Sequence, residues 1–233
     1  MIYYYDLHIH SILSPDADVL MTPNNIFNMA YLKKLDIVAV TDHNSARQLK
    51  ICDEISQSYD ILFIPGIELS LKEDIHVLCY FENVNDALAC DEKLEPWRSK
   101  KRYDGRLGSD QGITDIHDEV IDFYPHDLSD NLSLSLLELK EIIQSFRHIL
   151  VFAHVDRKKH SGLAYIDTHP CDAVEVSQSA HDDFIRENHL ESRIILYSSD
   201  AHFITDMNER TEKNKLELES LTTEAFFKYF HHG

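Results

Sequence analysis

Short apolar runs alternate with longer amphipathic stretches along most of the chain. Runs of this length are typical of buried strands, and apolar residues at helical spacing are typical of helices that bury one face. Strands are predicted at 3–10, 36–40, 61–64, 75–81, 149–153, 172–176 and 194–198. Strands that alternate with helices predict an α/β fold, in which a parallel sheet is closed or covered by helices.

The first two predicted helices have recognisable starts and buried faces. Thr22-Pro23 places a capping residue before a proline at the first helical position, and Ser45 is expected to cap the next helix. The buried faces are expected to contain Phe27, Ala30, Tyr31 and Leu35 in the first helix and Leu49, Cys52, Ile55 and Tyr59 in the second. A closing helix over 222–232 is expected to bury Phe226, Phe227 and Phe230.

Residues 82–146 interrupt the alternation of strands and helices. This section contains a helix around Leu94, a loop rich in glycine and charge over 100–112, and a second helix around Leu139. We expect it to be an elaboration over the mouth of a barrel, in the position of a lid. A chain of 233 residues is long enough for one domain with a good core, so we expect residues 1–233 to form a single domain.

The charge and the cysteines limit the class of protein. A formal net charge of -19 disfavours extended nucleic acid as a partner and still permits a compact anionic substrate held by metal. The cysteines are far apart and form no Cys-x-x-Cys pair, which predicts reduced thiols rather than a zinc ribbon or a disulfide framework. No apolar run is long enough to cross a bilayer and no leader precedes the first strand, so we expect a cytoplasmic protein without a membrane partner.

Histidines and carboxylates gather where the predicted strands end. His8 and His10 are separated by one residue at a strand end, so both imidazoles point to the same side. Strand ends converge at the mouth of a barrel, and unpaired imidazoles and carboxylates buried together there cost free energy unless cations compensate. The residues at these positions are His8, His10, Asp16, Asp42, His43, Glu68, His76, His154, Asp200 and His202. The sequence therefore predicts a metal centre.

The expected catalytic residues of that centre are Asp42, His43, Asp200 and His202. Asp42 is expected to orient an imidazole rather than to bind metal. Ser199 lies next to Asp200, but its neighbours are better explained as metal ligands than as parts of a nucleophilic triad. Arg157 and Lys158 follow the fifth predicted strand and are expected to bind substrate phosphate, with a solvated basic loop as an equal alternative.

The same motifs resemble those of the PHP (polymerase and histidinol phosphatase) family. They are Asp6-Leu7-His8-Ile9-His10-Ser11, Thr41-Asp42-His43, Gly66-Ile67-Glu68, Ile75-His76-Val77-Leu78, Ala153-His154 and Ser199-Asp200-Ala201-His202. Their order and relative spacing match from residue 3 to about residue 203. The chain is more similar to the small stand-alone and TrpH-like phosphoesterases than to the polymerase-associated domains. The resemblance implies a distorted (β/α)7 TIM-like barrel that hydrolyses phosphoesters, with up to three metal ions at the C-terminal ends of its strands.

Carried onto matching positions, the resemblance implies a set of ligands for each metal ion. The first ion would be held by His8, His10, Glu68 and Asp200. The second would be held by His76 and His154, with Glu68 as a bridge, and the third by Asp16, His43 and His202. The loop around Asp16 also offers Asp18, and His154 is followed by Val155 where relatives have proline.

Some positions stay open at the level of sequence. Glu175 faces either the core or the mouth, because a slip of one residue in strand register reverses its direction. His160 and His181 follow strand ends on the predicted mouth side. The middle section is shorter than in TrpH-like members, so the resemblance does not transfer their substrate.

The predicted function is a metal-dependent phosphoesterase that uses metal-activated hydroxide on a phosphomonoester of a small metabolite or nucleotide. Two or three divalent ions are the expected cofactors, and mixed nitrogen and oxygen ligands suit zinc, manganese and iron alike. The first alternative is a nuclease or nucleotide bisphosphate phosphatase acting on short oligonucleotides, favoured if Arg157, Lys158 and the run 100–102 form a channel. The second is a non-catalytic metal-binding regulatory module, which the complete ligand set disfavours.

Overall fold

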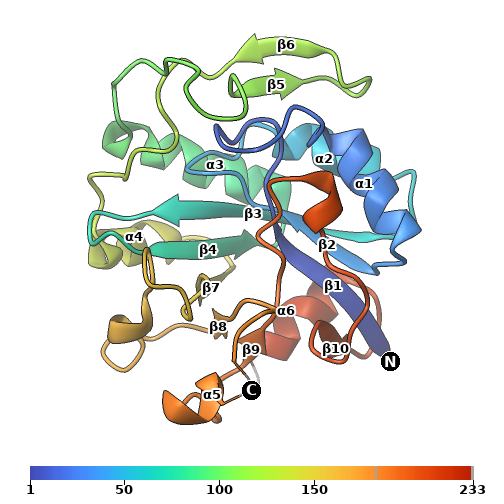
Figure 1. Ribbon diagram of the computed structural model, residues 1–233, viewed down its shortest axis with the longest axis vertical. Helices are drawn as coiled ribbons and strands as arrows, with labels where there is room; N and C mark the ends of the chain where they lie inside the picture. The colour runs from blue at the N-terminus through green and yellow to red at the C-terminus, as the bar shows by residue number, and fades with distance from the viewer. Residues whose placement is uncertain (182, 232–233) are drawn as a thin grey trace.

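One curled sheet forms the centre of the fold (Figure 1). The computed structural model describes residues 1–181 and 183–231, and within them the sheet has eight strands in the order β10-β1-β2-β3-β4-β7-β8-β9. The strands are β1 Ile2–Ile9, β2 Ile37–Val40, β3 Leu62–Ser70, β4 His76–Phe81, β7 His148–Phe152, β8 Ala173–Glu175, β9 Ile195–Leu196 and β10 Lys215–Glu217. The mixed α/β fold is as predicted, and the curled half-barrel is consistent with a distorted TIM-like barrel.

The sheet is mixed rather than wholly parallel. β1, β2 and β3 are parallel neighbours, and so are β7, β8 and β9. β4 runs antiparallel to both β3 and β7, and β10 runs antiparallel to β1. The expectation of a parallel sheet is wrong at these strands. For β3 and β4 the reason is the 71–75 turn, which is too short for the crossover that a parallel pair needs. Ser70 at the end of β3 therefore pairs with His76 at the start of β4.

The two ends of the sheet approach each other near the end of β1. Ile9 forms an isolated parallel bridge with Ala201, which follows β9. The Tyr5 hydroxyl accepts a hydrogen bond from the Tyr197 amide at 3.0 Å, and Asp6 Oδ1 accepts one from the Ser199 amide at 3.0 Å. Side chains of β1 therefore span the gap in the barrel, and they bring the segment after β9 to the mouth.

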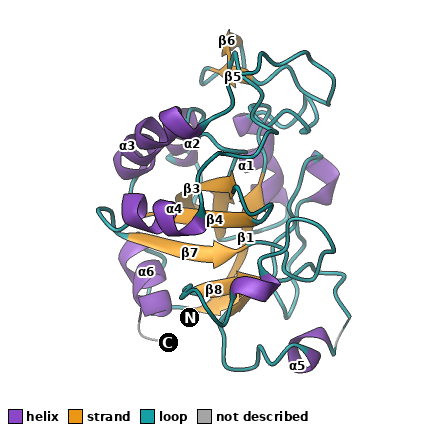
Figure 2. Cartoon of the chain, turned by 90° about the vertical axis from the view of Figure 1, so that its left-hand side faces the viewer, coloured by secondary structure: helices purple, strands orange, loops and turns teal. Residues whose placement is uncertain are grey.

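Helices cover both sides of the sheet. They are α1 Pro23–Leu32, α2 Leu49–Ser56, α3 Val84–Leu94, α4 Leu136–Ile143, α5 Phe184–Glu187 and α6 Thr223–His231. α1, α2 and α3 lie on one side, and α6 lies on the other (Figure 2). Phe226, Phe227 and Phe230 of α6 are buried as predicted, in a cluster with Tyr5 and Tyr80, and residue 232 of the predicted helix lies outside the described residues.

The first two helices differ from the prediction in length, capping and buried face. α1 ends at Leu32 and α2 at Ser56, so Leu35 and Tyr59 lie outside them. α2 begins at Leu49, and Gln48 occupies its capping position, so Ser45 lies too far upstream to cap the helix. The amide of Ala46, which follows Ser45, donates to Asp91 Oδ1 at 2.7 Å. In α1, Tyr31 is 64% exposed, and Ile26 joins Phe27 and Ala30 in the buried face instead.

The middle of the chain contains a small hairpin that the sequence pattern does not predict. β5 Gly112–Thr114 and β6 Val120–Phe123 form a separate two-stranded sheet, at the top of Figure 1. Asp118 in its turn accepts hydrogen bonds from the Thr22 hydroxyl at 2.7 Å and the Asn24 amide at 3.2 Å. The turn of the hairpin is thus fixed to the start of α1. No helix in the described part of the chain is long and apolar enough to cross a membrane.

Candidate metal centre

The histidines and carboxylates of the motifs meet at one edge of the curled sheet. His8 lies in β1 and Glu68 in β3, whereas His76 is the first residue of β4. His154 follows β7, and Asp200 follows β9. His76 reaches this edge only because β4 is antiparallel, so its position at the start of a strand is equivalent to the end of a parallel one. Of these five residues, His8, Glu68 and His154 are buried, and His76 and Asp200 are partly exposed.

The first group of potential ligands is compact. One donor atom from each of His8, His10, Glu68 and Asp200 lies within 4.8 Å of all the others. The Nε2 atoms of His8 and His10 are 3.1 Å apart, and each is also 3.1 Å from Asp200 Oδ1. Glu68 Oε1 lies 3.3 Å from His8 Nε2. These residues are the set that the family resemblance implies for one metal ion.

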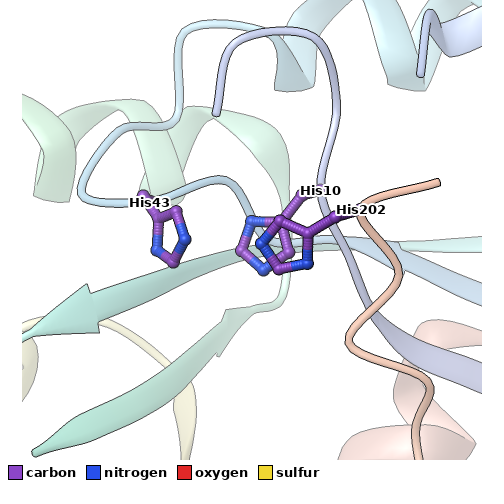
Figure 3. Close-up of side chains that lie close together, drawn as sticks. All are labelled: His10, His43 and His202. Carbon is purple, nitrogen blue, oxygen red and sulfur yellow. The ribbon is translucent and has the colours of Figure 1, made fainter. Parts of the chain in front are cut away.

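Two further groups overlap with the first. Glu68 Oε1 lies 2.9 Å from His76 Nδ1 and 3.2 Å from His154 Nε2, which forms the second group. His10, His43 and His202 form the third group, and Figure 3 shows their imidazoles side by side. Asp16 Oδ2 lies 3.3 Å from His43 Nε2 and 3.2 Å from His202 Nε2. The structure therefore brings all of the sequence-predicted ligands together in three overlapping groups, with Glu68 between them.

The donor atoms fit divalent metal ions. With metal to ligand distances of about 2.0–2.2 Å, neighbouring ligand atoms around one ion lie about 3.0–3.5 Å apart. The contacts within the three groups, 2.9 to 3.3 Å, have this spacing. His43 Nδ1 and Glu68 Oε2 are buried 2.9 Å apart, and His202 Nε2 lies 3.2 Å from Asp16 Oδ2, but none of these three atoms forms a hydrogen bond with a described residue. Buried polar atoms without partners are costly, so their spacing and chemistry are those of a site for cations.

The carboxylates favour the protonated form of His8 and His43. Burial disfavours charge on His8 and His43, but the surrounding carboxylates outweigh it and hold the pKa of each imidazole well above its ordinary value. The imidazoles hold the pKa of Glu68 and of Asp200 below the ordinary value in spite of burial. Metal ligands must be deprotonated, so an ion that binds here displaces protons from the imidazoles.

Backbone strain occurs at two of the ligands. His154 has φ 32° and Asp200 has φ 54°, in the left-handed region that residues other than glycine seldom adopt. Such strain persists only where the surrounding contacts enforce it, and it concentrates at functional sites. At His154, the amide donates to Glu175 Oε2 at 3.0 Å.

Glu175 is a functional residue whose direction the sequence left open. Its side chain points to the mouth, where its two oxygens lie 2.9 and 3.1 Å from His8 Nδ1. When one ring nitrogen of an imidazole binds metal, a carboxylate that accepts a hydrogen bond from the other nitrogen fixes the tautomer and the orientation of the ring. Val174 and Val176 are also buried, so no alternation of polar and apolar residues marked the register.

Asp42 lies beneath the centre and does not line its cavity. It accepts hydrogen bonds from the Ser11 amide at 2.7 Å and from the Ser14 hydroxyl at 2.8 Å. Ser14 Oγ lies 2.9 Å from His10 Nδ1. Asp42 therefore reaches an imidazole through a serine, which is an indirect form of the orienting role expected from the sequence.

A cavity of about 600 Å³ opens above the ligands. A cationic run, Arg157 to Lys159, lines one side together with His160. Arg157 also forms an ion pair with Asp200. The side chains that sequence reasoning missed are Ser70, Ser129, Asn131 and Lys159. His181 does not line the cavity.

The second basic run, residues 100–102, does not extend this cavity. Lys100 pairs with Glu95 at 2.8 Å, and Lys101 pairs with Asp127 at 3.1 Å. Neither lysine lines the cavity, and Arg102 lines a different hollow beside β6. The two basic runs therefore do not form the continuous channel that was the condition favouring a nuclease.

No protein-family model matches the sequence, and no curated protein matches it either. Solved structures do match. The chain aligns with the lesion-specific endonuclease PfuEndoQ from Pyrococcus furiosus with a TM-score of 0.74 and 22% identity, over 100% of this chain and 57% of that one. A complex of Endonuclease Q with a 27-mer duplex substrate, which has an abasic lesion at the active site, aligns with a TM-score of 0.69 and 21% identity over the same shares, 100% and 57%.

A further match covers nearly the whole of both chains. A protein from Bifidobacterium adolescentis that is described as a metal-dependent phosphoesterase aligns with a TM-score of 0.63 and 14% identity, over 98% of this chain and 96% of that one. The chain thus spans 57% of the length of the endonuclease chains, and almost all of the phosphoesterase. At these identities the likeness concerns the fold. The chain therefore shares its fold with these structures.

Proposed function

We propose that this chain is a metal-dependent phosphoesterase. The observation that carries the proposal is the convergence of three overlapping ligand groups at the base of one cavity with a cationic side. Likeness to an endonuclease and to a described phosphoesterase supports hydrolysis of phosphoesters. The complete ligand set argues against a non-catalytic regulatory module, in which we would expect some of these positions to be lost.

The residues divide into ligands and supporting groups. His8, His10, Glu68 and Asp200 would hold one divalent ion, His76 and His154 a second with Glu68 shared, and His43, His202 and Asp16 a third. Bound zinc, manganese or iron would supply a water of lowered pKa and charge stabilisation for the phosphoryl group. Glu175 holds the His8 ring, and Asp42 holds His10 through Ser14.

Arg157 and Lys158 would bind the substrate phosphate. Both line the cavity, and Arg157 is already directed to the ligand Asp200. A guanidinium group has five N–H donors in a planar fork, so Arg157 can keep its contact with Asp200 while other donors bind a phosphate oxygen. Lys158 adds a second positive charge at the same side of the cavity.

Several features favour a small substrate. The cavity has a volume of about 600 Å³, within the range of sites for small molecules. The net charge of -19 opposes the approach of long polyanions. The 100–102 run is engaged in ion pairs away from the cavity. We therefore propose a phosphomonoester of a small metabolite or nucleotide. The cysteines are free thiols, which supports a reducing compartment such as the cytoplasm.

A nuclease is the second candidate, and a specific observation favours it. The structures with the higher TM-scores are endonucleases, and one of them holds a duplex substrate. This chain matches 57% of their length. The rest of each endonuclease chain therefore has no counterpart in this alignment. A short oligonucleotide end would need only the cationic side of the cavity.

The test is hydrolysis by protein reconstituted with zinc, manganese or iron. It is measured as phosphate release from phosphomonoesters and nucleoside bisphosphates, and as release of nucleotides from short oligonucleotides. The double variant His8→Ala/His10→Ala should lose all activity, whereas His117→Ala/His181→Ala, which removes two exposed histidines, should retain it. Preference for one substrate class separates the phosphatase from the nuclease. Stoichiometric metal binding without turnover on any substrate would contradict the proposal and favour the regulatory module.

A further inference from the structure

We propose that residues 98–130, termed here the clamp, position the third ligand group by holding both loops that carry Asp16 and His43. This positioning role rests on the proposed function for the existence of a third metal ion. It follows from two separate contacts of the clamp and from the hydrogen bonds that join them.

The first contact is with the 11–21 loop, which contains Asp16. The amide of Ser109 donates to the carbonyl of Pro15 at 2.9 Å, and the Ser109 hydroxyl donates to the carbonyl of Ile12. The Tyr103 hydroxyl donates to the same Pro15 carbonyl at 3.2 Å. Hydrogen bonds from the clamp therefore fix the backbone immediately before Asp16.

At Gly108 the clamp lies too close to the 11–21 loop to leave room for a side chain. A Cβ atom at this position would lie 2.6 Å from the Ala17 carbonyl oxygen and 3.2 Å from that of Asp16. Both neighbours are backbone atoms, so neither can turn away. The same loop is tied to the other side of the group, because the Asp18 amide donates to the His202 carbonyl at 2.8 Å. A shift of this loop would thus move Asp16 and pull on His202.

The second contact is with Asn44, the residue after His43. The Asn44 side-chain amide donates to the carbonyls of Leu128 at 2.9 Å and Asp130 at 3.2 Å. The Asn44 backbone carbonyl accepts a hydrogen bond from Arg98 Nε at 2.7 Å. Asn44 has φ 53°, and these buried bonds help to stabilise that conformation. The clamp therefore holds the residue after His43 from one side. From the other side, the Asn44 amide donates to the Glu68 carbonyl of β3 at 2.8 Å.

Gln111 joins the two contacts into one unit. Its side-chain amide donates to the carbonyls of Tyr124 at 2.9 Å and His126 at 2.7 Å, and its carbonyl oxygen accepts from the Leu128 amide at 2.8 Å. Gln111 is 0% exposed, and its own amide donates to Ser109 Oγ at 3.0 Å. The hydrogen bonds thus run from the Asp16 loop through Gln111 to the segment that binds Asn44.

The other two groups have a different support. His8 lies in β1, and Glu68 and His76 lie in the β3–β4 ladder, where the hydrogen bonds of the sheet fix their backbone. Loss of the clamp contact should therefore weaken the third site and leave the first two intact. A general loss of stability would weaken all three.

Gly108→Ala is the variant that tests this inference, with Gly112→Ala as its matched control. At Gly112 a Cβ would meet only side-chain atoms of Val120 and Ile12, at 3.4 Å or more. The measurement is the number and affinity of Mn²⁺ ions bound in equilibrium dialysis, together with the thermal midpoint of the metal-free protein. We expect Gly108→Ala to bind two ions normally and the third about 10- to 100-fold more weakly, as for other losses of support around metal ligands.

Each outcome decides the matter. Three ions bound equally well by Gly108→Ala would overturn the clamp and leave the proposed function standing. Wild-type protein that binds no more than two ions would also overturn it, since no third site would need positioning. If Gly108→Ala does not fold, Ser109→Ala replaces it, because this variant removes the hydrogen bond to Ile12 and retains the backbone one to Pro15. Selective weakening of the third ion supports the clamp, and unchanged affinity for it refutes the clamp.

Discussion

The two sides of the metal centre are built in different ways. On one side, His8, Glu68 and His76 are part of the sheet, and their positions follow from strand pairing. On the other side, Asp16 and His43 lie in loops. A section of chain far away in sequence holds the backbone before Asp16 and the side chain of Asn44, and the His43 backbone also forms a bridge with Glu68 of β3. Strand pairing therefore positions part of the first two groups, whereas we propose that the third group depends on the clamp.

The largest effect is expected for the residue that both sides share. Glu68 approaches His8, His43, His76 and His154 within 3.3 Å, so Glu68→Gln removes one negative charge from all three groups. We expect metal affinity to fall by more than about 100-fold, beyond the usual effect of losing a supporting residue, and phosphate release to disappear. Isothermal titration with Mn²⁺ measures the loss. Exposed Glu54→Gln on α2 is the control, and wild-type affinity in Glu68→Gln would contradict the shared role.

A smaller and one-sided effect is expected for Glu175→Gln. The amide has the same shape as the carboxylate but lacks its charge, so His8 loses the partner that fixes its tautomer. Affinity for the first ion should fall by about 10- to 100-fold, with the third ion less affected. Asp42→Asn should show the weaker effect, because Asp42 reaches His10 through Ser14. Equal losses of all ions in Glu175→Gln would indicate a general structural role instead.

The pH dependence of metal binding should follow from the protonated histidines. Carboxylates hold the pKa of His8 and His43 well above the ordinary value, so at neutral pH these imidazoles retain protons that a metal ion must displace. Affinity should therefore rise as pH is raised from 6 through 8, and protons should be released on binding. Titrations in two buffers of different ionisation enthalpy count these protons. Affinity that is constant over this range would contradict the assignment.

The smallest effect is expected at the cationic side of the cavity. Lys158 is exposed and forms no ion pair within the described part of the chain, so Lys158→Ala should leave metal binding unchanged. Its loss should raise KM for a phosphomonoester a few-fold, about the strength of one exposed charge contact, with kcat retained. Steady-state kinetics at low and high salt measure this, and the difference between variant and wild type should shrink with salt. An unchanged KM at low salt would exclude Lys158 from phosphate binding.

The sequence predicted the part of the centre that lies in the first strand and at its end, because a local pattern of residues marks it. His8 and His10 follow from the alternation of side chains in one strand, and the apolar runs before them mark where strands lie. The direction of β4 could have been read from the short 71–75 turn, which excludes a helical crossover. The register of Glu175 could not be read, because its neighbours are buried on both faces of the sheet.

The support of the other side had no local signal. Ser109 and Ile12 are separated by 97 positions, and Asn44 and Leu128 by 84. Gly108 and Gln111 lie in a stretch whose glycines and charges are typical of an exposed loop, and Gln111 is buried nevertheless. Such contacts are set by tertiary packing, and the sequence pattern contains no sign of them.

The most direct test of the metal centre is a crystal structure of the protein grown with Mn²⁺, examined by anomalous diffraction. We predict peaks at two or three positions, one among His8, His10, Glu68 and Asp200, one beside His76 and His154, and a third, if filled, among Asp16, His43 and His202. The absence of any peak at saturating Mn²⁺, with these side chains joined by hydrogen bonds instead, would contradict the account.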